Sequence, residues 1–526
     1  MIDKLRPYHP HIYFFCLTLL AVAMPFSKPV MSIAQILLLI NWLIEGNLKS
    51  KINSFLRNKT ALIISSIWIL HLVGLIYTAD IDYGIKDAKT KFPLFLLPLI
   101  ISTSVPLSAK QLKMLLLFFV SAIVANTLIG IGALYGLFKK EITDVRGISL
   151  FVSHIRFGLM ICLSVFIMFF YFKKESKLSV RIILALLIVW TIIFLFILES
   201  LTGIFVLITA IFITGSFYIF NKGKTWMKII FPIAIISAGI FLFQFLKAEI
   251  EAVVSVKQKI DFNQIDSRTK NGKKYLHDIN NTQAENGYYV GLFICLEETE
   301  SEWNKRSKIK FNENDKKGNE IRFTILRYLT SKGLRKDAEG VKSLNENDIS
   351  FIESGAANCN YTNFSSIRSR IHEIVWELNE YKSGRNSSGH SLTQRLEFWK
   401  TSFDIIEENI FFGVGTGDPP SAFKMQYIKN NSQLKEKFRL RSHNQFFAIA
   451  VSFGIIGLIW FLFCLIYPFV NGKIASRYFY SVFIIIVALS FVNEDTLESQ
   501  AGVTFFALFN SLFLFCSEKK VDHTES

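Results

Sequence analysis

Apolar runs of roughly the length of a membrane span recur along most of the 526 residues. A helix that crosses a bilayer needs about 20 mostly apolar residues, at about 1.5 Å per residue. The runs lie near residues 11–26, 30–45, 61–77, 92–103, 113–137, 157–172, 182–198, 204–220, 229–246, 446–470, 478–492 and 503–516. This pattern predicts an all-α polytopic membrane protein with about twelve transmembrane helices, although the shorter runs fall below the usual length.

Basic residues are in excess, and a formal net charge of +16 would indicate a nucleic-acid partner in a soluble chain. Here 51% of the residues are hydrophobic, and much of the positive charge lies in short loops beside the apolar runs. Such loops are typical of the cytoplasmic side of a membrane. We therefore expect no nucleic-acid partner and both termini in the cytoplasm. A strict alternation does not bring every basic loop to that side, so one or two predicted spans must be wrong.

A long polar segment, residues 247–442, separates two apolar regions. We predict an N-terminal membrane bundle of about nine spans at 1–246 and a C-terminal bundle of about three spans at 443–516. Residues 517–526 form a predicted cytoplasmic tail. The polar segment lies outside the membrane on this topology and is too long for a structureless loop.

Local patterns predict secondary structure inside the polar segment. Apolar residues recur at helical spacing in residues 321–329 and 366–381, so this segment should be mostly helical. Residues 288–296 fit either a strand or the start of a helix. Cys295 and Cys359 either form a disulfide or remain free, and no Cys/His pattern in the chain indicates a metal site.

The stretch of residues 392–457 holds the densest group of candidate chemical residues. Arg395 and Trp399 are four positions apart and therefore lie on one face of a predicted helix. A glycine-rich turn follows at residues 413–417, with the sequence GVGTG. This turn lacks the Lys-Ser/Thr pair of a P-loop, and taken alone it is more typical of a tight turn than of a phosphate cradle.

Arg439, Arg441 and His443 directly precede the apolar run 446–470. The N-terminus of a helix exposes unpaired N–H groups and carries a partial positive charge, so with these arginines and Arg395 it is suited to a phosphate or pyrophosphate. His443 would add a proton acceptor whose ordinary pKa suits general-base catalysis. The alternative is that the basic residues only flank a membrane helix and that His443 caps it.

A second candidate site is the basic loop that contains Lys139, Lys140, Arg146, His154 and Arg156. On the predicted topology this loop lies outside the membrane, against the usual charge distribution, which indicates an anionic partner or an internal ion pair. The alternative is that His154 and Arg156 extend to the membrane interface from an apolar helix.

An acidic loop, residues 493–498, lies between the last two apolar runs. We place this loop on the outer side of the membrane as well. Its carboxylates, Glu494, Asp495 and Glu498, either pair with the arginines of the candidate site or remain solvated, which is the commoner outcome for exposed charges.

Three motifs in the central stretch resemble those of the O-antigen ligase and polymerase family. They are residues 395–399 (RLEFW), residues 413–417 (GVGTG) and residues 443–445 (HNQ), the last followed by an apolar run with Gly454 and Gly457. Members of this family are bacterial multi-span envelope proteins with one large periplasmic loop. The predicted spans and the place of the polar segment agree with that organisation.

The resemblance implies transfer of a glycan from undecaprenyl diphosphate to an acceptor sugar at the periplasmic face of the bacterial inner membrane. It implies no metal, nucleotide or other cofactor. In ligases the acceptor is the lipid A core, and in polymerases it is another carrier-linked glycan. The family's diphosphate-binding arginine maps to Arg395 and its histidine to His443, which would be the general base of an inverting reaction.

Similar enzymes often carry a Ser-Arg pair at the outer end of a middle span, where this chain has Ser200 and Leu201. Either Arg146, Arg156 or Arg441 supplies the missing charge, or part of the site is lost. We predict that these three arginines bind the substrate diphosphate together with Arg395. The supporting residues of the predicted site are Trp399, Gly413, Gly415, Asn444 and His154.

A transporter of lipid-linked anionic glycans would also use many spans and interfacial arginines. However, the sequence shows no paired halves, no obvious pair of interrupted spans and few ionisable groups deep in the apolar runs. These observations favour an enzyme, either a ligase or a polymerase, and the sequence does not separate those two.

Overall fold

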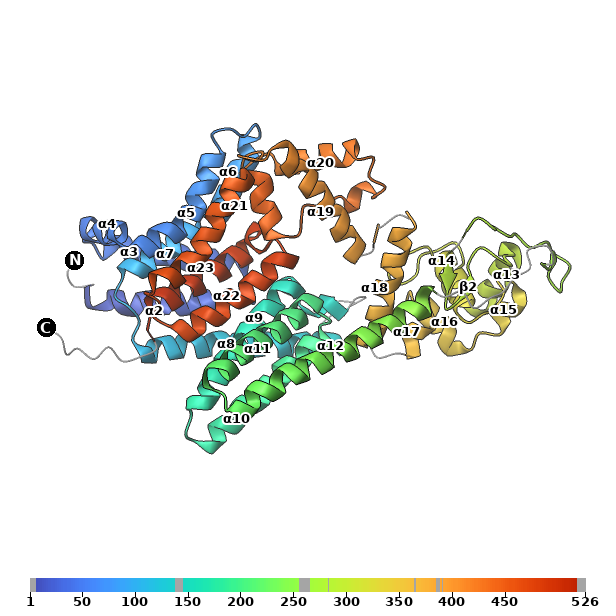
Figure 1. The fold of residues 1–526 in the computed structure, drawn as a ribbon, viewed down its shortest axis with the longest axis horizontal. Coiled ribbons are helices and arrows are strands. Elements are labelled where there is room, and N and C mark those ends of the chain that lie inside the picture. The colour runs from blue at the N-terminus through green and yellow to red at the C-terminus, as the bar shows by residue number, and fades with distance from the viewer. Residues whose placement is uncertain are drawn as a thin grey trace. The chain divides into compact units, whose positions relative to one another are not determined.

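The computed structural model describes residues 6–137, 145–254, 265–281, 283–363, 366–384, 388–389 and 391–517. These residues are mostly helical, as predicted (Figure 1). The chain divides into two compact units. The first unit contains Met1–Lys222, Arg395–Ser432 and Arg439–Ser526, and the second contains Gly223–Gln394 and Gln433–Phe438.

Every predicted apolar run of the first unit forms a helix. Its elements are η1 (Arg6–Tyr8), α2 (His9–Ala23), α3 (Lys28–Ile44), α4 (Leu48–Arg57), α5 (Lys59–Gly74), α6 (Ile81–Lys91), α7 (Pro93–Thr103), α8 (Ala109–Leu134), η2 (Val145–Ile148), α9 (His154–Lys174), α10 (Leu178–Ile197), α11 (Leu201–Lys222), most of α19 (Ser391–Glu408), α20 (Pro419–Lys429), α21 (Gln445–Asn471), α22 (Arg477–Asn493), η4 (Thr496–Glu498) and α23 (Gln500–Phe515).

Among the described residues, six helices are long and apolar enough to cross a membrane by themselves, namely α8, α9, α10, α11, α21 and α12 of the second unit. Helices α3 and α4 would add a seventh span if they are counted as one, although the chain bends by 112° between them. Helices α2, α5, α22 and α23 are apolar but shorter. The structure therefore supports a polytopic all-α membrane protein, and the total of about twelve spans stays a prediction.

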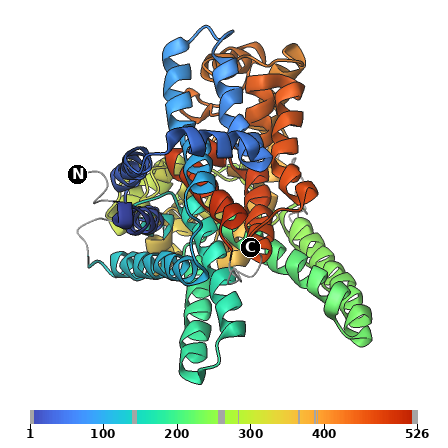
Figure 2. The same cartoon turned by 90° about the vertical axis from the view of Figure 1, so that its left-hand side faces the viewer.

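Helix α23 lies at the centre of the first unit (Figures 1 and 2). Every residue from Ala501 to Leu514 is buried, and the helix packs against α7 and α22. A helix that is apolar on all sides is stable when protein surrounds it, so its length of 16 residues is no obstacle to a central place. Phenylalanine rings, among them Phe483 and Phe509, fill the space around it.

Helix α21 is broken at Gly454, which has a non-helical conformation with φ 64° and ψ −165°. The break frees the carbonyl groups of Val451 and Ser452 from their usual helical partners. Both carbonyls instead accept hydrogen bonds of 2.9 Å from N–H groups of the turn 413–417. An unpaired backbone group in an apolar surrounding is costly, so this turn makes the break in α21 possible.

The second unit is a small helical subdomain with one two-stranded hairpin. Its elements are α12 (Thr225–Val254), β1 (Ala284–Glu285), β2 (Tyr288–Tyr289), α13 (Leu296–Arg306), α14 (Ile321–Ser331), α15 (Ala338–Lys342), α16 (Glu346–Glu353), α17 (Asn360–Asn363), α18 (Ser366–Lys382) and η3 (Glu436–Phe438). The strands pair antiparallel, with Glu285 opposite Tyr288. A buried apolar cluster around Trp303, Ile325 and Leu329 forms its core.

The helices expected at residues 321–329 and 366–381 are present as α14 and α18, so these predictions are confirmed. For residues 288–296 both alternatives hold in part, because β2 begins at Tyr288 and α13 begins at Leu296. No disulfide joins Cys295 to Cys359, so that alternative is wrong. Cys359 instead packs its sulfur against the carbonyl oxygen of Ser331, at 3.5 Å.

The predicted division into 1–246, 247–442, 443–516 and 517–526 depends on the two sides of a membrane, which the structure does not define. It therefore stays a prediction. Helix α12 of the second unit is apolar and none of its central residues is buried within the protein, which is typical of a helix that faces lipid.

Candidate functional site

His443 lies directly before α21 and is held there by its neighbour Asn444. The Asn444 side-chain oxygen accepts a hydrogen bond from the Phe447 N–H, at 3.0 Å, and so caps the helix. Its amide nitrogen donates to the Val492 carbonyl at the end of α22, at 2.9 Å. His443 has a φ of +44°, a left-handed conformation that is uncommon outside glycine and is often found at functional sites. The cap of α21 is therefore Asn444, so the alternative that His443 caps this helix is wrong. The interpretation of His443 and the arginines as a phosphate site stays a prediction.

The imidazole of His443 faces two buried carboxylates of the loop after α22. Its Nδ1 lies 3.7 Å from Glu494 Oε2 and 3.9 Å from Asp495 Oδ1. Arg395 reaches the other oxygen of Glu494, with Nη2 at 3.3 Å from Oε1. The Phe398 ring, one turn along α19 from Arg395, packs against the imidazole with 5.6 Å between ring centroids. The acidic loop therefore pairs with the site, as one of the two alternatives proposed.

Arg441 extends this cluster of charges. Its Nη1 donates to Glu498 Oε2 and to the Tyr83 hydroxyl, at 3.2 Å each, and its Nη2 lies 4.0 Å from Asp495. The loop that carries the carboxylates is itself fixed, because the Leu497 N–H donates to the side chain of Gln445 in the first turn of α21, at 2.7 Å. Arg395, Arg441 and His443 are thus brought together around Glu494, Asp495 and Glu498.

The two neighbouring carboxylates have pKa values shifted in opposite directions. Burial acts to raise the pKa of Glu494, but its interactions with His443, Arg395 and Arg156 outweigh burial, so the pKa lies below its ordinary value. Burial raises the pKa of Asp495, and repulsion from Glu498 and Glu494 adds to it against the attraction of His443 and Arg441. Opposite shifts in adjacent carboxylates are common where acid–base chemistry takes place.

Besides Arg441, Arg156 is another of the three arginines predicted to replace the one missing at Leu201 that acts on the cluster. It stands on the first turn of α9, where its Nη1 donates to Ser153 Oγ at 3.0 Å, and its charge acts on Glu494. A Cβ at Gly158, two residues along α9, would lie 3.0 Å from Ser200 Oγ, so α9 and the Ser200 corner are adjacent.

Other predicted residues lie further from this cluster or act on the backbone. Arg146 is exposed in η2, and His154 is the first residue of α9. Lys139 and Lys140 lie outside the described residues. Arg439 donates to the Ser432 carbonyl, at 3.0 Å, instead of pointing to the carboxylates. Trp399 packs near Phe447, and its buried indole N–H has no hydrogen-bond partner among the described residues.

Gly413 and Gly415 support the site through the backbone. Both have positive φ values, 67° and 94°, and the turn they form pairs with the break in α21. A Cβ at Gly413 would lie 2.4 Å from the Phe453 nitrogen, so only glycine fits there. The following Asp418 accepts the N–H groups of Ala79 and Asp80, at 2.8 Å each, which ties the turn to the loop before α6. The N–H groups of the turn are therefore occupied, and it forms no phosphate cradle.

Sequence patterns missed a polar face of α6. Tyr83, Asp87 and Lys91 are spaced four residues apart and reach the same cluster through Arg441 and Glu498. The i, i+4, i+8 spacing of polar residues in a short amphipathic segment was a signal for this face, but the partner groups are about 350 to 400 residues away in sequence.

His443, Glu494 and Asp495 are also a group that could hold a metal ion. Each offers one ligand atom, and these atoms lie within 4.8 Å of one another. However, Arg395 and Arg441 already oppose the two carboxylate charges, so the cluster needs no cation for charge balance. The expectation that the site works without a metal stays a prediction.

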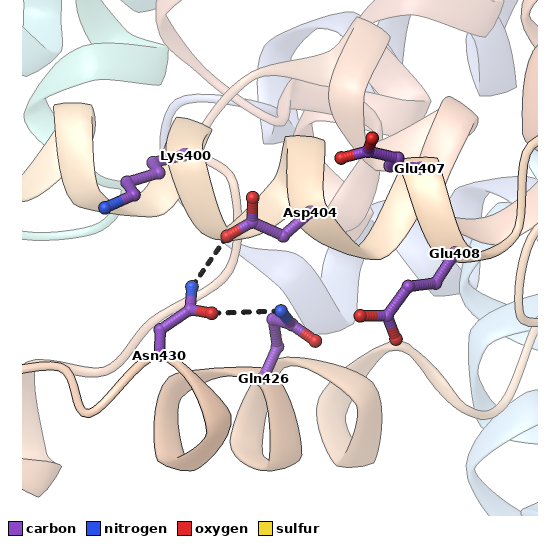
Figure 3. A pocket seen from close by; sticks show the side chains of 6 residues that line it. All are labelled: Lys400, Asp404, Glu407, Glu408, Gln426 and Asn430. Atoms are coloured by element: carbon purple, nitrogen blue, oxygen red, sulfur yellow. Dashed lines mark hydrogen bonds between the residues drawn. The ribbon is translucent and has the colours of Figure 1, made fainter.

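A hollow of about 400 Å³ lies between α19 and α20 (Figure 3). Polar side chains line it, and Asn430 donates to Asp404, at 2.7 Å, across its floor. Asp404 is nine residues after Arg395, which at 100° per residue places it on the opposite face of α19. This hollow is therefore separate from the cluster around His443.

Comparison with known proteins identifies the central stretch. Residues 354–462 match a family model described as O-antigen ligase. No curated protein matched the chain. The matched residues include Arg395, Arg441, His443 and the glycine turn, whereas α6 and the acidic loop lie outside them. Because this family consists of glycan ligases and polymerases, the match supports an enzyme of the glycosyltransferase type in lipopolysaccharide biosynthesis. It confirms the resemblance found in the three motifs, because residues 354–462 are similar to the O-antigen ligase family.

Proposed function

We propose that this protein transfers a glycan from undecaprenyl diphosphate to the lipid A core at the periplasmic face of the bacterial inner membrane. The single observation that carries the proposal is the position of His443, whose Nδ1 faces the carboxylates of Glu494 and Asp495. The same two carboxylates pair with Arg395 and Arg441. The predicted topology, with the large loop in the periplasm and both termini in the cytoplasm, places these groups where the lipid-linked glycan is available.

The arginines bind the diphosphate leaving group. Glu494 holds Arg395, and Glu498 holds Arg441, so both guanidinium groups are oriented before a substrate arrives. Guanidinium groups bind phosphate oxygens in a bidentate manner and oppose the negative charge that grows as the glycosidic bond breaks. The positive end of α21 acts in the same direction, and Arg156 supplies the third positive charge.

His443 accepts the proton of the acceptor hydroxyl. Because Nδ1 faces the two carboxylates, Nε2 is the nitrogen that remains for the hydroxyl. Glu494 and Asp495 then stabilise the imidazolium ion that forms, as the acidic member does in other carboxylate–histidine pairs. The oxygen attacks the anomeric carbon on the side opposite the diphosphate, so the reaction inverts that centre. The diphosphate leaves as an anion and needs neither a metal nor a nucleotide in this scheme.

A polysaccharide polymerase that uses the same site is the second candidate. The family match covers ligases and polymerases alike, and the two differ only in the acceptor. In a polymerase the hydroxyl that His443 deprotonates belongs to another carrier-linked glycan in place of the lipid A core.

Reconstitution of the purified protein with undecaprenyl-diphosphate-linked glycan, with and without lipid A core, tests this proposal. Gel analysis shows which lipid carries glycan. Glycan on the core supports a ligase, and longer glycan on the carrier supports a polymerase. No transfer to either acceptor would contradict both. Arg395→Ala should abolish transfer while the protein remains folded and inserted, because the leaving group loses a main counter-charge.

A further inference from the structure

Helix α6 carries a buried lysine that the proposed reaction does not use. Lys91 is the last residue of α6, and only 2% of its surface is exposed. Its Nζ donates to both oxygens of Asp87, at 2.7 and 2.8 Å, and lies 2.9 and 3.0 Å from the two oxygens of Glu498. Burial acts to lower the pKa of Lys91, but Glu498 and Asp87 outweigh it and hold the pKa above its ordinary value, so the ammonium stays charged.

Two further groups show that this arrangement is built around Lys91. His71 Nδ1, from α5, lies 3.2 Å from Asp87 on the other side of that carboxylate. Tyr83, on the same face of α6, accepts a hydrogen bond from Arg441. The α6 face therefore touches the predicted diphosphate site at two points, through the Tyr83 hydroxyl and through Glu498.

Glu498 is shared between two cations, and this sharing affects Arg441. The carboxylate lies about 3 Å from Lys91 and 3.2 Å from Arg441. Lys91 is almost fully buried, whereas 35% of the Arg441 side chain is exposed and can reach a ligand. If Lys91 neutralises Glu498, the charge of Arg441 remains available. If Lys91 were uncharged, Glu498 would neutralise Arg441 instead.

We infer that Lys91 is a positioning residue that neutralises Glu498 and so leaves the positive charge of Arg441 uncompensated by that carboxylate and available to an anionic substrate. This inference rests on the proposed function, because the anion it concerns is the diphosphate of the lipid carrier. Lys91 itself touches neither substrate nor His443 in this role. A neutral side chain at position 91 therefore acts mainly on the binding of the diphosphate and only weakly on the chemical step.

The decisive experiment compares Lys91→Gln, which keeps hydrogen bonding but removes the charge, with Lys91→Arg, which keeps the charge. Lys86→Gln is the matched control, because Lys86 is an exposed lysine of the same helix. KM for the lipid-linked glycan and kcat are measured separately. We expect Lys91→Gln to raise KM about tenfold, the value of one lost charge interaction, with kcat changed by less than about threefold. Lys91→Arg and Lys86→Gln should stay within about threefold of the wild type.

A double variant separates charge neutralisation from general structural support. In Lys91→Gln/Glu498→Gln both charges are removed, so Arg441 no longer faces an unshared carboxylate, and KM should fall clearly below that of Lys91→Gln. A KM that stays high in the double variant, or an unchanged KM in Lys91→Gln, would overturn the inference. If Lys91→Gln does not fold, the double variant is compared with Glu498→Gln, in which position 498 carries no charge for Lys91 to neutralise. An equal KM in these two variants supports the inference, and a higher KM in the double variant overturns it.

Binding of inorganic pyrophosphate, measured by its effect on the thermal unfolding temperature, separates this inference from the proposed function. A wild-type protein that binds pyrophosphate but transfers no glycan contradicts the proposed function. The inference then stands if Lys91→Gln weakens that binding about tenfold, and it fails if binding is unchanged. A wild type that neither transfers glycan nor binds pyrophosphate would overturn both.

Discussion

Two segments of the family motif meet helix α21 in different ways. The corner at Arg441–Asn444 meets its N-terminus and directs side chains, above all His443, at buried carboxylates. The glycine turn at residues 413–417 meets the break at Gly454 and uses only backbone groups, with two hydrogen bonds of 2.9 Å. On the proposed function, the corner contributes chemical groups, whereas the turn only makes the break in α21 possible. Substitutions in the two parts should therefore fail in different ways.

The largest effect is expected at the corner. His443→Ala removes the proposed base and should lower transfer by about 10²–10⁴-fold in the reconstituted assay, the range found for general bases. The unfolding temperature should change little, because 31% of the imidazole is exposed and Asn444, not His443, caps α21. Transfer at the wild-type rate by the folded variant would contradict the assignment of His443 as the base. A large fall in the unfolding temperature of His443→Ala would contradict the distinction between the corner and the turn.

The next effect is expected at the turn and should appear as instability. Gly413→Ala places a Cβ 2.4 Å from the Phe453 nitrogen at a φ of +67°, so the turn must move away from α21. We expect a loss of about 2–4 kcal/mol in the free energy of unfolding, from strain and lost hydrogen bonds. Thermal unfolding and the yield of folded protein measure this loss.

Gly136→Ala is the matched control for that prediction. Gly136 has a similar φ of +75°, but a Cβ there would meet nothing within 4 Å. Gly136→Ala should lower the free energy of unfolding by only about 1 kcal/mol, which is the strain of the backbone alone. Equal losses in the two variants would show that the contact between the turn and α21 contributes little.

The comparison also shows what sequence patterns can and cannot predict. Helices were predictable, because apolar runs and 3.6-residue periodicity are local signals, and His443, Arg395 and Arg441 were found because they lie in one short stretch. Lys91 was missed because its partner Glu498 is about 400 residues away, and such pairing has no local signal. The GVGTG sequence indicated a tight turn, but the break at Gly454 that it serves depends on packing between distant segments.

A smaller effect on activity is expected at Arg156, which we propose to supply the charge missing at Leu201. Arg156 acts on Glu494 from the first turn of α9, whereas Arg146 is exposed in η2. Arg156→Gln should raise KM for the lipid-linked glycan about tenfold through one lost charge contact, and Arg146→Gln should have the smaller effect of the two. Steady-state kinetics of both variants measure the difference. A larger effect for Arg146→Gln would assign the third charge to η2 instead.

The smallest expected effect is on the pH dependence of stability. It concerns the two carboxylates that His443 faces, Glu494 and Asp495, and it has opposite signs for the two. The pKa of Glu494 is lowered in the folded protein, so its charge stabilises the fold above the ordinary pKa and that stabilisation is lost as the pH falls through the lowered value. The pKa of Asp495 is raised, so the folded protein binds its proton more tightly, and stability is lost as the pH rises from the ordinary value through the raised one.

Glu494→Gln should therefore destabilise the protein at neutral pH. The loss should be only about 1–2 kcal/mol, because the partners of Glu494, Arg395 and His443, are partly exposed. The difference in stability from the wild type should shrink in acid. Asp495→Asn should stabilise it at neutral pH, and this gain should also vanish in acid, where Asp495 is protonated. Thermal unfolding of both variants from about pH 4 to about pH 8 measures the two trends. If both variants change the stability at neutral pH in the same direction, His443 and the arginines shift the pKa values of the two carboxylates in the same direction. The distinction between a charged Glu494 and a proton-binding Asp495 would then be wrong.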